Sequence, residues 1–351
     1  MVFSEASSES LRDGAGAAIC LLHPRGSRGA EGVREVSTPQ KVLDERVKRK
    51  RDYIKSRGNK AIIIDGKSVA DEIKQVVAKD VANFKNSVGK APGLGVIFVG
   101  TRRESELYVH NKTIACAEAG MASSCTRLSE NASEEEVLAS VKKYNEDPSV
   151  DGILVQLPLP KHLNEDKILS SISLVKDVDG CHPSNIGSLA NGKQPLFVPC
   201  TAKACLQILL KNRIQLSGRY AVVIGCGNIA GLPISLLLQK HNATVTRVHA
   251  LTETPEDYTR RADIVIAAAG CPNLVRGGWL KNEAVILDVG ISHTQDSLSG
   301  DLHLVGDVCI EEARKVASVI SPVPGGVGPV TIAMLLQNTI LAAQLRHGLK
   351  T

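Results

Sequence analysis

Residues 219–231, RYAVVIGCGNIAG, decide the fold of this chain. The apolar run 219–225 is typical of a buried strand, and its glycines come just before a helix that we expect over 232–240. Glycines in this place permit a tight turn and let a pyrophosphate approach main-chain N–H groups at the start of a helix. The order of strand, glycine loop and helix therefore predicts a dinucleotide-binding unit, with a plain tight turn as the alternative.

Apolar strands and helices alternate on both sides of this unit, which predicts an α/β protein with parallel sheets. Ligands of such sheets gather beyond the carboxyl ends of the strands. The last predicted helix is apolar on most faces, so we expect it to be buried against the first globular segment. Strands are predicted at 61–65, 93–100, 150–160, 243–249, 263–270, 284–290 and 319–320, and helices from Ser68, over 105–119, from Ser133 and over 331–345.

The composition excludes several classes of protein. The 351 residues suffice for two domains. The sequence has no run of about 18 apolar residues, so it does not predict membrane insertion. Residues 1–60 hold 13 Lys and Arg against 8 Asp and Glu, which accounts for the whole net charge of +5. The remainder is neutral, so we expect no nucleic-acid partner. The nine cysteines follow no zinc-ligand spacing, which predicts unpaired thiols in a reducing compartment.

Residues 1–57 are predicted to be a disordered or targeting extension. Residues 1–40 are rich in Ser, Gly, Ala and Arg, and residues 41–57 are helix-compatible and heavily charged. Three acids among the first 13 residues are unusual for an organelle presequence. A solvated extension is therefore the alternative to a targeting segment.

Tyr108 and Lys112 stand four residues apart in a predicted helix, so their side chains share one face. A lysine can act as an acid–base group where a dry pocket lowers its pKa, and a phenol can orient or stack on a flat substrate. The pair alone is more often an ordinary surface pair. Gln156 ends the strand that begins near residue 150, and its amide should bond either the lysine or loop backbone.

Two further segments could contact a ligand. Asp177 and Asp179 stand two residues apart without further oxygen or His ligands, which makes a poor metal site. We predict no metal and expect one carboxylate to accept hydrogen bonds from a heterocycle. Residues 321–329, SPVPGGVGP, predict a stiff turn with few side chains that lets a flat ligand approach the backbone.

Taken in order, these segments resemble a known family, the bifunctional methylenetetrahydrofolate dehydrogenase/cyclohydrolases of the FolD type. The resemblance spans about residues 60–346 and is strongest to plant organellar members. It is carried by Tyr108-x-x-x-Lys112, Asp151-Gly-Ile-Leu-Val-Gln156-Leu-Pro-Leu-Pro160, Lys176-Asp-Val-Asp179-Gly180 and Pro322-Val-Pro-Gly-Gly-Val-Gly-Pro329.

The resemblance implies oxidation of 5,10-methylenetetrahydrofolate to the methenyl form with NADP, then hydrolysis to 10-formyltetrahydrofolate. It implies a catalytic folate-binding domain, residues 58–200 with 330–351, and a Rossmann-type domain, residues 201–329, with a cleft between them. A homodimer is expected on the same ground. Mitochondrion is the expected compartment, with plastid as the alternative and cytosol less favoured.

By matching position, four residues form the implied catalytic set. Lys112 handles the water and proton steps, Tyr108 stacks on the folate, Gln156 tunes Lys112, and Asp179 holds the pterin edge. The other implied folate contacts are Val155, Leu157, Pro324, Gly325, Gly326, Val327 and Gly328, and the implied cofactor contacts are Gly225, Cys226, Gly227, Ala250 and Ile291.

Departures from the family pattern cluster at the cofactor loop. Cys226-Gly227 stands where the family usually has Ser, often preceded by Arg, and Ala250 stands where Ser or Arg is frequent. These changes remove side-chain donors that would hold a 2′-phosphate. The strand over 243–249 is nevertheless followed by no acid before Glu253, which favours NADP over NAD.

NADP is therefore expected and NAD stays possible. A cyclohydrolase-only or folate-binding relative with a drifted cofactor loop is the alternative function. A short-chain dehydrogenase also uses Tyr-x-x-x-Lys, but its glycine loop precedes that pair, whereas here the loop follows it.

Overall fold

The computed structural model describes residues 61–295 and 302–349 of the chain. The predicted extension over residues 1–57, with its targeting role, lies outside these residues. Within them, the predicted α/β architecture with parallel sheets is confirmed. One strand pair departs from the parallel arrangement, because β9 and β10 form an antiparallel hairpin.

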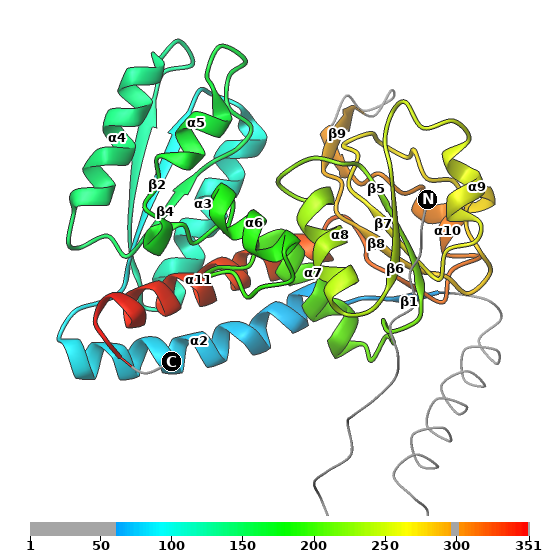
Figure 1. The fold of residues 1–351 in the computed structure, drawn as a ribbon, viewed down its shortest axis with the longest axis horizontal. Coiled ribbons are helices and arrows are strands. Elements are labelled where there is room, and N and C mark those ends of the chain that lie inside the picture. The colour runs from blue at the N-terminus through cyan, green and yellow to red at the C-terminus, as the bar shows by residue number, and fades with distance from the viewer. Residues whose placement is uncertain (1–60, 296–301, 350–351) are drawn as a thin grey trace, which may run out of the picture. The chain divides into compact units, whose positions relative to one another are not determined.

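Six parallel strands form the larger sheet, in the spatial order β1-β11-β8-β7-β5-β6. Figure 1 labels β1, β5, β6, β7 and β8 of this sheet. Their central members are fully buried, as the apolar runs in the sequence predict. The strands are β1 (Ile62–Ile63), β5 (Tyr220–Ile224), β6 (Thr244–Val248), β7 (Ile264–Ala267), β8 (Val285–Asp288) and β11 (Val319–Ile320); the hairpin strands are β9 (Ser292–Gln295) and β10 (Leu302–Val305).

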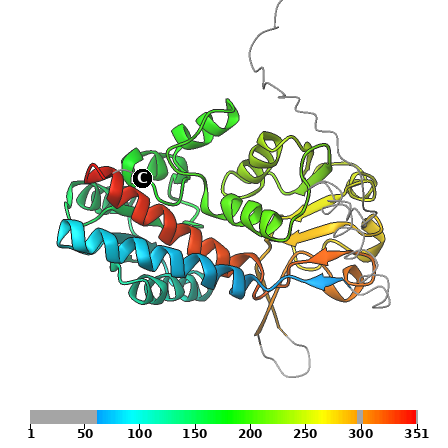
Figure 2. The same ribbon diagram turned by 90° about the horizontal axis from the view of Figure 1, so that it is seen from below.

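Strand β1 shows how the two ends of the chain meet. The sequence predicts that residues 61–65 belong to the first globular segment, but β1 pairs with β11 in the larger sheet (Figure 2). A two-residue strand carries no periodicity from which its partner could be predicted. The chain therefore starts in the larger sheet and crosses to the smaller one through helix α2 (Gly66–Val88).

Three parallel strands form the smaller sheet, in the order β3-β2-β4. Strand β2 (Gly93–Val99) is central and wholly buried, and β4 (Gly152–Val155) lies on one side of it. Strand β3 (Ala122–Leu128), on the other side, was missed in the sequence. It is a mostly exposed edge strand with polar residues, so it has neither an apolar run nor clean alternation.

The long helices pack around a shared core. As expected, α11 (Val327–Arg346) packs back on the first segment, chiefly along α2, and it also contacts α7 (Cys200–Lys211) (Figure 2). Helix α11 is long and apolar enough to span a membrane by length and composition, but 67% of that stretch is buried inside the protein. The remaining helices are α3 (Arg103–Glu118), α4 (Glu134–Glu146), α5 (Glu165–Ser170), α6 (Pro183–Ala190), α8 (Gly231–Lys240), α9 (Pro255–Thr259) and α10 (Ile310–Ala313), with 3₁₀ turns η1 (Leu174–Lys176) and η2 (Gly277–Trp279).

Helix starts test the capping predictions. The capping box of α4 is confirmed, because Ser133 and Glu136 bond each other's main-chain N–H groups. The start of α2 at Ser68 was wrong: Asp65 is the N-cap and accepts from the Ser68 N–H at 3.0 Å. Helix α11 also begins four residues earlier than expected, so the Pro/Gly segment ends within its first turn.

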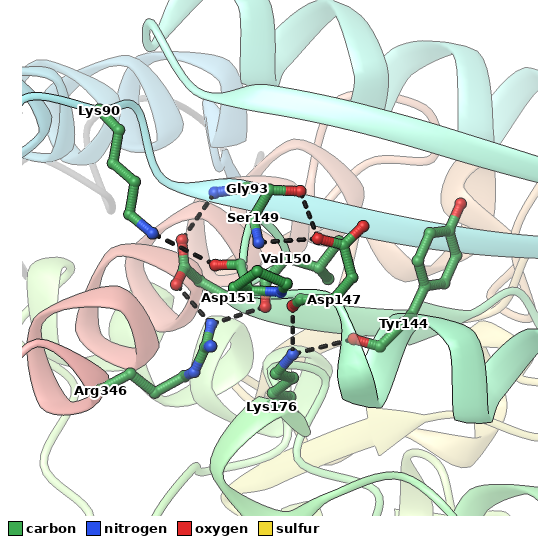
Figure 3. Close-up of polar contacts among 10 residues, drawn as sticks. Lys90, Gly93, Tyr144, Asp147, Ser149, Val150, Asp151, Lys176 and Arg346 are labelled. Carbon is green, nitrogen blue, oxygen red and sulfur yellow. Dashed lines mark hydrogen bonds and ion pairs between the residues drawn. The ribbon is translucent and has the colours of Figure 1, made fainter.

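A buried polar cluster fixes the start of β4 (Figure 3). The Asp151 carboxylate is fully buried and accepts from the Gly93 N–H at 3.0 Å and from Arg346 at the end of α11 at 2.6 Å. Beside it, the Lys176 ammonium donates to the carbonyls of Tyr144 and Asp147 at 2.9 and 2.8 Å. The hydrogen bonds of Asp151 therefore connect the start of β4 with the start of β2 and with the end of α11.

Candidate functional site

Lys112 and Gln156 meet at the carboxyl end of β4. The Lys112 side chain comes from α3, is only 9% exposed, and its Nζ donates to Gln156 Oε1 at 2.9 Å. Gln156 Nε2 in turn donates to the Leu157 carbonyl at 2.8 Å, which sets the amide so that its oxygen faces the lysine. Of the two expected partners for Gln156, the structure contains both. An ammonium has three N–H groups, so Lys112 keeps donors for a ligand.

Tyr108 lies one helical turn before Lys112, next to the start of α11. Its phenol is half-buried, and burial raises the pKa of the hydroxyl, which keeps it neutral. A Cβ built on Gly328 would lie 3.8 Å from the Tyr108 hydroxyl, so the Pro/Gly segment reaches this residue. The segment is also anchored to α2, because the Gly66 N–H donates to the Gly325 carbonyl at 3.0 Å.

The two aspartates after η1 have different environments. Asp177 is 1% exposed, and its carboxylate accepts from the main-chain N–H groups of Cys181 and His182 and from the Asn185 amide. It therefore organises the loop that leads into α6. Asp179 is half-buried, and among the described residues no N–H group bonds its carboxylate. Asp179 is thus the carboxylate that can accept from a ligand.

The charges of Asp179 and Lys112 both affect the pKa of two cysteines, Cys181 and Cys200. Burial raises the pKa of the Cys181 thiol well above its usual value; Asp179 adds to the rise and Lys112 opposes it. Cys200, at the start of α7, responds to the same two charges. The structure therefore brings Asp179 and Lys112 around one space, although 67 residues separate them in the sequence.

Asn338 of α11 bonds the main chain next to Asp179, and the sequence analysis does not predict this role. Its amide donates to the carbonyls of Val178 and Val198 at 2.9 and 3.1 Å and accepts from the half-buried amine of Lys203 at 2.9 Å. The sequence around it, Gln337-Asn338-Thr339, gives no signal that singles out Asn338.

The predicted cofactor contacts lie at the carboxyl edge of the larger sheet. Gly225 follows β5 with φ of 103°, and a Cβ there would lie 2.1 Å from the Ala268 carbonyl, so the loops after β5 and β7 approach closely. Gly227 is exposed, and no atom would contact a Cβ on it, which leaves the start of α8 open to a phosphate. Ala250 follows β6, and Ile291 follows β8; both are exposed.

A cavity of about 350 Å³ lies between α5, α6 and the start of α8. Cys181 lines it on the side of the Asp179 loop, and Asn228 and Ile229 line it on the side of the glycine loop. Segments next to both predicted contact regions therefore line one cavity, although Lys112, Gln156 and Asp179 themselves are not in its lining. No group of three or more His, Cys, Asp or Glu side chains suited to a metal occurs in the described part of the chain.

Comparisons with known proteins agree with this geometry. Residues 64–179 match the family profile of the tetrahydrofolate dehydrogenase/cyclohydrolase catalytic domain, and residues 199–347 match that of the NAD(P)-binding domain of the same family.

Relatives cover most of the chain. The mitochondrial bifunctional protein FolD 1 of Arabidopsis thaliana is 55% identical, with 81% of this chain and 82% of the relative aligned. The chloroplastic FolD 4 of the same plant is also 55% identical, over 84% and 82%. The Trypanosoma brucei dehydrogenase-cyclohydrolase, solved with NADP and an inhibitor, is 41% identical, covers 82% of this chain and 99% of its own, and superposes with a TM-score of 0.79.

Two profiles that together match most of the chain, and relatives at this identity, agree with the site that the residues build. The chain belongs to the tetrahydrofolate dehydrogenase/cyclohydrolase family.

Proposed function

We propose that this protein oxidises 5,10-methylenetetrahydrofolate to the 5,10-methenyl form with NADP and then hydrolyses that product to 10-formyltetrahydrofolate. The observation that carries the proposal is the Lys112–Gln156 pair at the carboxyl end of β4, which shares the neighbour Cys181 with Asp179, in a chain that also has a glycine loop after β5. A dehydrogenase needs both a folate side and a cofactor side facing one space, because hydride transfer requires the two reacting carbons in contact.

Lys112 is proposed as the acid–base group of the hydrolysis. Its ammonium or amine, held by Gln156, would handle the proton of the water that adds to the methenyl carbon. Tyr108, whose neutral phenol stands beside Gly328, would stack on the folate. Asp179 would accept hydrogen bonds from the pterin N–H groups. Val155, Leu157 and the segment from Pro324 to Gly328 would complete the folate side.

The residues of the larger sheet fit a dinucleotide. Bound NADP supplies the hydride acceptor. Cys226 and Gly227 would place main-chain N–H groups at its pyrophosphate, and the positive end of α8 favours that charge. Gly225, whose N–H donates to the Val248 carbonyl, would supply the tight turn before them. Ala250 would lie at the ribose and Ile291 on the nicotinamide side. Cys226 and Ala250 bring no charged group to a 2′-phosphate, which is the observation behind the cyclohydrolase-only alternative.

The same arrangement supports a division of the chain into two domains. We propose a catalytic folate-binding domain of residues 58–200 with 330–351, and a dinucleotide-binding domain of residues 201–329, although β1 pairs in the larger sheet. Support comes from α11, which packs chiefly along α2 and also contacts α3; its contact with α7 connects it to the second domain.

A homodimer is proposed as the working form. The outer edge of β3 is unpaired within the described chain, and α3 beside it exposes Leu107 and Ile114. An open strand edge flanked by apolar side chains suits a second copy. Analytical ultracentrifugation should give twice the chain mass, and Ile114→Glu should shift it toward the monomer; a monomeric unaltered protein would refute the dimer.

Mitochondrial import is proposed for the full chain. The basic, serine-containing residues 1–57 support it, as does the similarity to a relative named as mitochondrial. A fluorescent fusion of the full chain should enter mitochondria; plastid or cytosolic fluorescence would reject that compartment.

The decisive experiment is absorbance-monitored oxidation of methylenetetrahydrofolate by the full chain, with NADP and NAD compared. We expect turnover with NADP, and we expect Lys112→Met to lower hydrolysis of added methenyltetrahydrofolate by about 10²–10⁴-fold. Lys142→Met, on an exposed face of α4, is the matched control and should leave both activities unchanged.

Other outcomes would separate the candidates. Hydrolysis that depends on Lys112, without oxidation by either cofactor, would establish the cyclohydrolase-only reading. Loss of neither activity in Lys112→Met would remove Lys112 from the proposed chemistry. Silence in both assays would reject the enzyme.

A further inference from the structure

Two buried carboxylates lie beneath the cofactor edge of the larger sheet and have no role in the chemistry described above. Asp288 ends β8 and is 4% exposed, and Asp307 follows β10 and is fully buried. Carboxylates are rarely buried unless they are bonded or paired, so their partners indicate what they do.

Asp288 uses both of its oxygens. Oδ1 accepts from the main-chain N–H groups of Gly290 and Asp307, each at 3.0 Å, and Oδ2 accepts from that of Val308 at 2.9 Å. The Asp288 N–H donates to Ser321 Oγ at 2.7 Å. One residue thus joins the loops that follow β8, β10 and β11.

Asp307 uses only one oxygen. Oδ2 accepts from the N–H groups of Ala269 at 2.6 Å and Gly270 at 3.0 Å, in the loop after β7. Oδ1 is buried and has no partner among the described residues. It lies over Gly290, where a Cβ would come within 2.1 Å of it, so any larger residue there would displace the carboxylate.

The loops held in this way are those that face the cofactor. Ala268 and Ala269 abut Gly225 of the glycine loop, Gly290 precedes Ile291, and Ser321 begins the Pro/Gly segment. A cavity of about 70 Å³ beside Asp288 and Ser321 is large enough for water, which can complete the solvation of the carboxylate. The two carboxylates therefore hold the cofactor loops, whereas the segment assigned to the folate is reached only through the main-chain N–H of Asp288.

We propose that Asp288 and Asp307 are positioning residues of the oxidation: they hold main-chain N–H groups of the loops after β7, β8 and β10, and so fix the surface that receives the nicotinamide end of NADP. The inference rests on the proposed function. Neither side chain touches the hydrolysis site around Lys112, so the two activities should separate when either is changed.

The bonding pattern predicts unequal responses to the same substitution. In Asp288→Asn, one accepting oxygen becomes an N–H donor that faces another N–H group, so at least one loop is released. In Asp307→Asn, the amide oxygen keeps both bonds and the new NH₂ takes the place of the oxygen without a partner. Asp307→Ala removes both bonds and serves as the second disruptive variant. Asp263→Asn is the matched control, because Asp263 bonds the Tyr220 N–H at the opposite end of the same sheet.

The test measures NADP binding by calorimetry, the KM for NADP, and the hydrolysis rate without cofactor. We expect Asp288→Asn and Asp307→Ala to weaken NADP binding and raise that KM by about tenfold or more, since one lost hydrogen bond to a buried group is worth that much. Hydrolysis should stay within about twofold, and Asp307→Asn and Asp263→Asn should resemble the unaltered protein.

Equal losses of both activities, or unchanged NADP binding in the two disruptive variants, would overturn the positioning role. An Asp263→Asn effect as large as that of Asp288→Asn would do the same, because it would indicate a general loss of the sheet. If the unaltered protein hydrolyses methenyltetrahydrofolate but neither binds NADP nor oxidises its substrate, the proposed oxidation fails first, and this inference fails with it.

Discussion

The two ends of β4 place buried lysines in opposite circumstances. At its amino end, Lys176 donates to two main-chain carbonyls and lies beside the Asp151–Arg346 pair (Figure 3). It is 3% exposed. At its carboxyl end, Lys112 has one side-chain partner, Gln156. Both lysines are buried, so it is the number of their protein partners, and not burial, that supports a chemical role for Lys112 alone.

The aspartates after η1 repeat the contrast over two residues. Asp177 is saturated by three N–H donors of the protein, whereas Asp179 has none among the described residues. Burial raises the pKa of Asp177, and its hydrogen bonds oppose that rise. A ligand can use only the bonding capacity that the fold leaves free, so the member of each pair with fewer protein hydrogen bonds is the one assigned to the substrate.

The largest loss of stability is expected when the buried ion pair at the amino end of β4 is removed. Arg346→Met leaves the Asp151 carboxylate buried without its cation, which should cost about 3–5 kcal/mol of the free energy of unfolding. Chemical denaturation measures this loss. The activity of the protein that stays folded should be unchanged, because no atom of this cluster belongs to the proposed site.

Lys142→Met removes an exposed pair with Glu146 and is the control, expected to change stability by less than about 0.5 kcal/mol. An Arg346→Met protein that is as stable as the unaltered protein but has lost hydrolysis would contradict the structural role of this cluster. In that case, the amino end of β4 would have to be counted as part of the site.

An intermediate effect is expected from Asp177→Asn and Asp179→Asn. The first substitution replaces an accepting oxygen by a donor among N–H groups and should cost about 1–3 kcal/mol of stability with little change in the KM for folate. The second should leave stability unchanged and raise that KM by about tenfold. Thermal unfolding and steady-state kinetics on both proteins measure the two quantities, and effects of the same kind in both would remove the distinction.

Much of the fold could be predicted because it depends on local patterns. Apolar strands such as β2 and β5, the capping box of α4 and the glycine loop after β5 are each encoded within about ten residues. Edge strand β3 and the pairing of β1 were not predictable in this way. A solvated edge strand needs no apolar pattern, and a two-residue strand is positioned by distant partners.

The site divides along the same line. Tyr108, Lys112, Gln156 and Asp179 stand in motifs that resemble those of the family, and the structure adds the hydrogen bond between Lys112 and Gln156. Asp288, Asp307 and Asn338 act through main-chain groups far away in the sequence, so no spacing rule identifies them. The signal for the two aspartates is a polar residue within an apolar run, and only the fold shows whose N–H groups it serves.

The smallest effect concerns the pH dependence of stability. Burial raises the pKa of Asp288 to about 7, and the nearby Asp307 adds to the rise, while the three main-chain N–H groups that bond its carboxylate oppose it. The unfolded chain ionises this group near its ordinary pKa, and its contribution to stability is therefore full in acid and is lost as the pH rises through about 7. Asp307→Asn removes the neighbouring carboxylate and should flatten this dependence, leaving a Tm higher than that of the unaltered protein by about 2–4 °C near pH 8 and a smaller gap near pH 5. Differential scanning calorimetry at the two values measures it. Parallel curves for the two proteins would show that Asp288 does not sense Asp307, and that the two carboxylates support their loops independently.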